Sequence, residues 1–176
     1  MRTLNFVAQQ RIWMIVICLL IWASSRLPAA SLPDDGAAIG DWSLNSMIRA
    51  GPDTSPAYYL TNRLTYEKRT PSLDIACEKH RYLLRFSVEA PVQEKLKTSI
   101  AIAIDDKKPL LVTETKNVGW GLTAFLEGEL SVADLGRISE TKSSLSVASP
   151  ALQKTFTFKA SETARAIRTL RSVCEN

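Results

Sequence analysis

Two cysteines give the clearest chemical prediction in this chain of 176 residues. Cys77 and Cys174 lie downstream of a predicted export signal, so both thiols would pass through an oxidising compartment, where disulfides form and persist. We therefore predict a disulfide between them. A redox or metal-binding pair is the alternative, but the chain has no Cys-x-x-Cys motif, and His80 is its one histidine.

The other residues that could act in catalysis do not form a known arrangement. His80 lies in a charged turn, which is typical of a surface histidine, and two lysines and a proline follow Asp105-Asp106, which is typical of a solvated turn. The chain lacks the G-x-S-x-G and H-E-x-x-H motifs and a phosphate-binding glycine loop. We predict no enzymatic activity, no cofactor and no metal site. A hydrolase with a serine–lysine pair is the enzymatic alternative.

Two features are candidates for binding a partner. Trp120 lies between two glycines, where its large amphipathic ring could anchor a partner; a core tryptophan beside a bulge is the alternative. Arg165, Arg168 and Arg171 line one face of the last predicted helix. This face could bind an acidic partner, or it could simply be solvated.

The start of the chain has the layout of a secretory signal. Arg2 and Arg11 precede fourteen uncharged residues, 12–25, and small residues follow. As a helix this run would rise about 21 Å, which is less than the roughly 30 Å of a bilayer core. A cleaved signal is therefore predicted, with an uncleaved anchor over residues 12–25 as the alternative. Cys18 is interpreted as an apolar residue of the signal.

The signal sets the domain boundaries. Cleavage fits Ala29-Ala30-Ser31 or Ala23-Ser24-Ser25, and we assign residues 1–30 to the signal. Residues 31–41 are small and polar and contain Pro and Gly, so they are predicted to be a flexible linker. Residues 42–176 are predicted to form a single β-rich domain.

Removal of the signal changes the charge. The whole chain has a net charge of +4, but three of its 22 Lys and Arg residues and none of its 18 Asp and Glu residues precede residue 31. The mature part therefore has 19 basic and 18 acidic residues. This balance gives no reason to expect nucleic acid as a partner, and membrane contact is expected only through the signal.

Alternation of apolar and polar residues predicts most of the mature chain to be strand. The clearest pair is Leu73–Cys77 and Tyr82–Val88, joined by a short polar turn, with Cys77 on the apolar side. Further strands are predicted near Trp42 and at the segments 58–66, 100–104, 110–115, 122–127, 145–147 and 156–158.

Two helices complete the prediction. One opens at Ser131 and buries Ala133, Leu135 and Ile138; the other has Ser161 as its N-cap. The second buries a stripe at helical spacing, made of Ala164, Ile167, Leu170, Val173 and Cys174. The predicted fold is mainly β: an antiparallel β-sandwich-like domain with two short helices, whose C-terminal helix is tied to a strand by the disulfide.

The order of elements resembles the VasI family of periplasmic proteins associated with type VI secretion. The resemblance covers residues 42–174 and rests on the strand Leu73-x-Ile75-x-Cys77, on Ile104-Asp105 before a turn, and on Phe156-Thr157-Phe158 before a helix with a late cysteine. A second resemblance, to the exported invasion-associated locus B family, rests on the same Ile-Asp turn in a β-rich domain.

Both resemblances imply an accessory, non-enzymatic role in the bacterial envelope. The predicted function is that of an exported periplasmic binding protein with a protein partner in the envelope, associated with a secretion system. The alternatives are an envelope protein like those of the invasion-associated locus B family and the serine–lysine hydrolase.

Overall fold

The computed structural model describes residues 36–48, 56–64, 71–90, 97–105, 109–118 and 123–175. All of them belong to one compact unit, Pro33–Asn176. The strands are β1 (Ala37–Ile39), β2 (Trp42–Ile48), β3 (Pro56–Arg63), β4 (Ser72–Glu78), β5 (Arg81–Glu89), β6 (Lys97–Ile104), β7 (Leu110–Asn117), β8 (Thr123–Leu130), β9 (Ser144–Ser149) and β10 (Lys154–Lys159). The helices are α2 (Val132–Ser139) and α3 (Thr163–Cys174).

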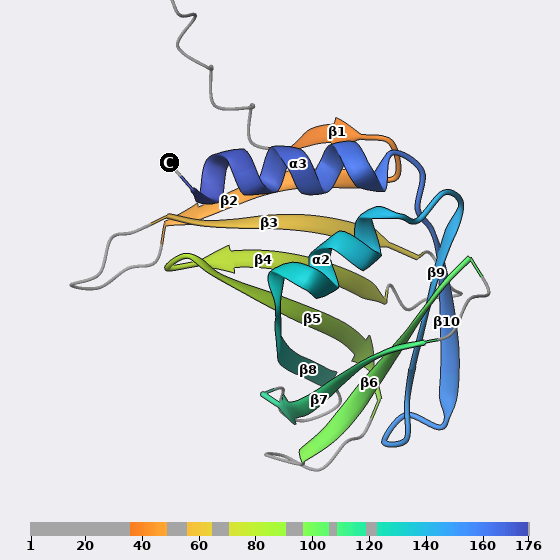
Figure 1. Ribbon diagram of the computed structural model, residues 1–176. Helices are drawn as coiled ribbons and strands as arrows, with labels where there is room; N and C mark the ends of the chain where they lie inside the picture. Colours follow the sequence, from red (N-terminus) through yellow and green to blue (C-terminus); the bar gives the residue numbers. More distant parts are fainter. Residues whose placement is uncertain are drawn as a thin grey trace, which may run out of the picture. The chain divides into compact units, whose positions relative to one another are not determined.

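The strands form one sheet in the order β1-β2-β3-β4-β5-β8-β7-β6-β9-β10 (Figure 1). Every paired neighbour is antiparallel. The predicted fold class, mainly antiparallel β with two helices and a disulfide from a strand to the last helix, is confirmed.

The sheet curls so that its two halves face each other. Strands β8, β7, β6 and β9 separate β5 from β10 in the sheet order. Even so, the ring of Phe86 on β5 lies 5.2 Å from that of Phe156 and 6.2 Å from that of Phe158, both on β10. The two layers of the sandwich-like core are therefore parts of one continuous sheet.

The core occupies the inner face of this curled sheet, as the alternation in sequence requires. On β4, Leu73, Ile75 and Cys77 are buried. Strand β5 pairs with β4 through a two-residue turn, Lys79-His80, in which both φ angles are positive. This conformation matches the twist of the flanking strands, so it fixes the register of the pair without a glycine.

Helix α2 follows its sequence signals closely. Ser131 is the N-cap, and its side chain accepts a hydrogen bond from the backbone N–H of Asp134, while Asp134 bonds back to the N–H of Ser131. Leu135 and Ile138 are buried as predicted, but Ala133 is exposed. The burial prediction for Ala133 is therefore wrong, because the helix turns that residue away from the sheet.

The linker predicted over residues 31–41 is too long. Ala37–Ile39 form β1, which pairs with β2, and Ile39 is buried. Gly40 makes the turn with φ +62°, in the left-handed region that favours glycine. The small residues therefore mark a hairpin as well as a linker, and residues 31–35 lie outside the described part.

The predicted signal over residues 1–30 and the alternative anchor over residues 12–25 also lie outside the described residues. Within the described part of the chain, neither helix has the length and apolar character required to cross a membrane.

Candidate functional site

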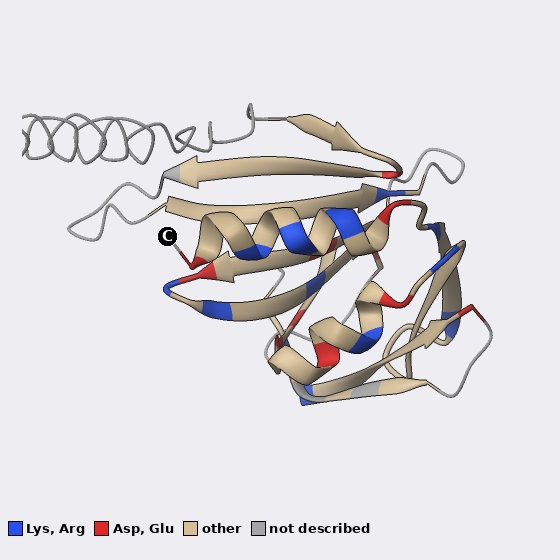
Figure 2. Ribbon diagram, turned by 45° about the horizontal axis from the view of Figure 1, so that its top comes forward, with Lys and Arg blue, Asp and Glu red and all other residues tan. Residues whose placement is uncertain are grey.

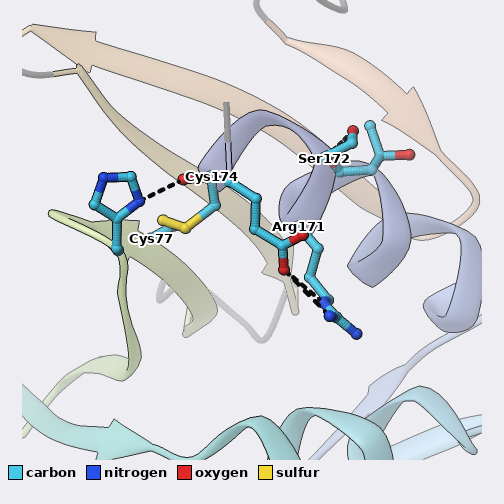
Figure 3. The surroundings of a disulfide bond; sticks show 7 residues. Cys77, Arg171, Ser172 and Cys174 are labelled. Carbon is cyan, nitrogen blue, oxygen red and sulfur yellow. Dashed lines mark hydrogen bonds and ion pairs between the residues drawn. A yellow bond between two sulfur atoms is a disulfide. The ribbon is translucent and has the colours of Figure 1, made fainter.

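The C-terminal end of α3 is tied to β4 by a disulfide (Figure 3). Cys77 and Cys174 are bonded, with their Cα atoms 5.9 Å apart and 97 residues between them in sequence. Both cysteines are buried, with exposed fractions of 3% and 6%. The predicted bridge is confirmed, and its burial shields it from exchange with external thiols.

His80 provides a second contact at this end of α3. Its Nδ1 lies 2.9 Å from the backbone oxygen of Cys174. Because a carbonyl can only accept, Nδ1 carries the proton in this bond. The imidazole therefore satisfies one of the carbonyls that a helix leaves unpaired at its C-terminus. His80 is exposed as predicted, and its contact serves the helix end.

The N-terminal end of α3 is held by the β1–β2 hairpin. A carboxylate oxygen of Asp41 accepts a hydrogen bond of 2.8 Å from the N–H of Ser161. The indole N–H of Trp42 donates to the hydroxyl of Thr163 at 3.0 Å, and both residues are buried. Hydrogen bonds from the backbone and side chain of Ser161 lower the pKa of Asp41.

The predicted cap of α3 is therefore wrong. The helix begins at Thr163, with Glu162 as an N-cap residue in the left-handed region and without a side-chain cap. The hairpin instead holds the residues at the start of α3, through the bond from Ser161 to Asp41 and the bond from Trp42 to Thr163. Gly40 is needed for this contact, because a Cβ there would lie 2.6 Å from the oxygen of Ser161.

Helix α3 packs one face against β2, β3 and β4. Ala166 is buried, whereas Ala164 of the predicted stripe is only half-buried. The rest of the predicted stripe is buried as expected, and it comprises Ile167, Leu170, Val173 and Cys174. Full burial of a valine, leucine or isoleucine side chain contributes about 1.5–3 kcal/mol to stability.

The opposite face of α3 carries the predicted arginines. Arg165, Arg168 and Arg171 are all exposed, and Figure 2 shows basic segments recurring along the helix. Arg171 pairs with Glu175 at 3.1 Å, and that hydrogen bond raises the pKa of Arg171. Arg165 and Arg168 make no ion pair within the described residues. We call these three residues the arginine row.

The arginine row is the predicted contact for an acidic partner. Guanidinium groups bind carboxylates through two parallel hydrogen bonds. Three residues apart, the side chains follow an oblique ridge of the helix. Because α3 is fixed at both ends, little backbone freedom would be lost on binding.

Trp120, the other predicted partner-binding residue, lies outside the described residues, as do its flanking glycines.

A second charged cluster, on the outer face of the sheet, was not predicted. Arg85 on β5 is 6% exposed. Its Nε donates to Glu127 and its Nη2 contacts Glu78, both at 2.7 Å. The Tyr59 hydroxyl donates to Glu78 at 2.9 Å, and the Tyr59 ring lies 5.3 Å from the guanidinium carbon. Burial alone would lower the pKa of Arg85, but contacts with Glu127, Tyr59 and Glu78 outweigh it and raise that pKa.

Asp74 lies beside this cluster, opposite Arg85 in the β4–β5 register. One of its carboxylate oxygens is buried and has no hydrogen-bond partner among the described residues. Burial raises the pKa of Asp74, although a hydrogen bond with Thr61 and the charges of Arg85 and Arg63 oppose the rise. The cluster thus holds one carboxylate that the fold leaves incompletely satisfied.

Asp105 has a structural role that the prediction of a solvated turn did not include. Its carboxylate accepts hydrogen bonds from the N–H groups of Lys142, Ser143 and Ser144 at 2.7–3.0 Å. These bonds lower the pKa of Asp105 strongly, and the bonds from Ser144 and Lys142 have the largest effect. Asp105 therefore fastens the loop between α2 and β9, and Asp106 lies outside the described residues.

Within the described part of the chain, no three His, Cys, Asp or Glu side chains come together as metal ligands. Comparison with known proteins gives no match: no family model, no curated protein and no solved structure matches the chain.

Proposed function

We propose that this protein is an exported accessory protein of the bacterial envelope, which acts by binding an acidic protein partner through the arginine row. The single observation that carries the proposal is that α3 is fixed to the sheet at both ends while Arg165 and Arg168 face solvent without an ion pair in the described chain. A rigid row of cations is suited to recognition rather than to stability.

Export is supported by two independent features. The first is the charge and length pattern of residues 1–30, which fits a cleaved signal. The second is the buried disulfide, since such bonds persist in oxidising compartments and are rare in the cytosol. The proposed association with a secretion system rests on the VasI-like order of elements and is the most specific part of the proposal.

The proposal is tested by crosslinking in intact bacteria, followed by recovery of the full chain from the periplasm. Wild type is compared with the double charge reversal Arg165→Glu and Arg168→Glu. The matched control reverses Lys97 and Lys116, which are exposed and paired on β6 and β7. It makes the same change in net charge on β6 and β7, which are not among the strands that α3 packs against most closely, β2, β3 and β4.

We expect wild type and the control to recover the same envelope or secretion component, and the arginine reversal to lose it. Equal recovery by all three proteins would contradict the role of the arginine row. Recovery of no envelope component by wild type would contradict the accessory function itself.

A further inference from the structure

Strand β10 ends the sheet, and among the described strands it pairs along one edge only. Its sole neighbour in the sheet order is β9, and in Figure 1 it lies at the margin of the described structure. Phe156 and Phe158 are buried, while Thr155 and Thr157 are exposed. The buried rings hold the strand in place, and no described strand pairs with its outer edge.

The hydrogen bonds at the end of the strand show which backbone groups point toward β9. The N–H of Ala160 donates to the oxygen of Ser143 at 2.8 Å. In an antiparallel ladder, residues with inward-pointing backbone groups alternate with residues whose groups point outward. Phe158 and Phe156 lie two and four residues before Ala160, so their N–H and C=O groups also face β9.

The backbone groups of the alternate residues therefore point away from the sheet. One such group is the oxygen of Lys159, which accepts a hydrogen bond of 2.6 Å from the side chain of Asn62 on β3. The N–H and C=O groups of Thr155 and Thr157 have no such partner within the described residues. An extended segment could pair with them.

We propose that an extended acidic segment of another protein adds as a strand alongside β10. Lys154, which also contacts the Phe156 ring, and Lys159, whose charge also acts on Asp41, lie at the two ends of the strand, and the sequences of β9 and β10 contain no acidic residue. Backbone hydrogen bonds supply affinity in this mode of binding, and alternate side chains supply specificity. This proposal does not depend on the arginine row.

The positions of the lysines define the partner further. They are five residues apart, so their Cα atoms are about 17 Å apart along the strand and their side chains leave opposite faces of the sheet. A matching segment carries two carboxylates five residues apart, which likewise leave opposite faces. A second copy of β10 is a poorer occupant, because it would bring four lysines together in one ribbon.

The test is amide hydrogen exchange on the full chain, with a defined peptide as the probe. The peptide has eight residues of threonine and valine, with glutamate at the second and seventh positions; the control peptide has lysine there. In the free protein, the amides of Thr155 and Thr157 should exchange much faster than those of Phe156 and Phe158. The glutamate peptide, at about ten times its dissociation constant, should slow Thr155 and Thr157 about tenfold.

Two variants separate edge pairing from other effects. Thr157→Pro removes an outward N–H that makes no bond with β9, so it should abolish the slowing at Thr155. Thr157→Val keeps the N–H and should preserve it. The proposal is overturned if Thr155 and Thr157 are already protected in the free wild type, or if millimolar glutamate peptide slows neither amide. Protection that rises with protein concentration alone would also overturn it, in favour of a second copy.

Discussion

Arg85 on β5 and Arg168 on α3 are the same residue type in two different settings. Arg85 is buried, and its guanidinium lies between Glu127 and Glu78 at 2.7 Å. Arg168 is exposed and has no ion pair within the described residues. Removing a buried cation leaves its buried carboxylate partners without compensation and is strongly destabilising. Removing an exposed cation changes the stability of the fold little. We infer that Arg85 serves the fold and that the exposed arginines of α3 are available to a partner.

The largest expected effect concerns the bridge that holds α3 in place. Replacing both cysteines, Cys77→Ala and Cys174→Ala, should lower the free energy of unfolding by about 4–5 kcal/mol according to the chain-entropy relation for such a loop. Urea unfolding of the oxidised wild type and the variant measures this difference. A loss below about 1 kcal/mol would mean that the bridge constrains the unfolded chain far less than its length implies.

Removal of the buried cation should have an effect of nearly the same size. Arg85→Ala removes the buried cation that contacts both Glu78 and Glu127, and we expect a loss of about 3–5 kcal/mol in the free energy of unfolding. Urea unfolding at neutral pH measures it, with Arg168→Ala as the matched control. Similar losses at the two arginines would remove the distinction between them.

Asp74→Asn should be stabilising at neutral pH, by less than the loss at Arg85. Burial raises the pKa of Asp74 in the folded protein, so the folded state binds this proton more tightly than the unfolded chain does. The contribution of Asp74 to the stability of the wild type therefore falls as pH rises from the unfolded pKa of about 3.9 through the raised pKa of the folded state. The amide does not titrate, so the advantage of the variant should grow over that window and then level off.

The opposite sign is expected at Asp41, which provides the control. Hydrogen bonds with Ser161 lower the pKa of Asp41, so its contribution is present above the unfolded pKa and is lost as pH falls through the folded one. Asp41→Asn should therefore destabilise the protein at neutral pH and converge with wild type in acid. Unfolding curves measured between pH 2 and pH 8 span the unfolded Asp pKa of about 3.9, so one series tests the expected sign of the stability change for both variants.

The smallest effect should come from the exposed arginines. Arg165→Ala with Arg168→Ala should change the free energy of unfolding by no more than about 0.5 kcal/mol, as is usual for surface positions. Urea unfolding checks this, and a larger loss would show that the arginine row supports α3 instead of remaining available for binding.

Local patterns in the sequence predicted much of the fold. Alternation identified the β4–β5 pair, and Ser131 marked the start of α2. The two-residue turn at Lys79-His80 even places Asp74 opposite Arg85, so one contact of the unpredicted cluster was within reach of the sequence. The stripe of α3 and the apolar side of β4 were sufficient to predict the disulfide.

Long-range pairing could not be predicted in the same way. Glu127 reaches Arg85 only because β8 lies beside β5, and no local signal specifies that neighbour. Asp41 holds the N–H of Ser161, just before α3, because a hairpin distant in sequence folds against this end of the helix. The small residues of β1 resemble a linker until β2 pairs with them.

The fixed helix and its exposed arginines depend on export of the chain and on oxidation of its two thiols. The most direct test treats intact bacteria with a membrane-permeant alkylating reagent and then determines the mass and N-terminal sequence of the protein. We expect unmodified Cys77 and Cys174 in protein from the envelope fraction, and a mature chain that starts within residues 24–32. A full-length chain in the cell interior with both cysteines alkylated would contradict this prediction.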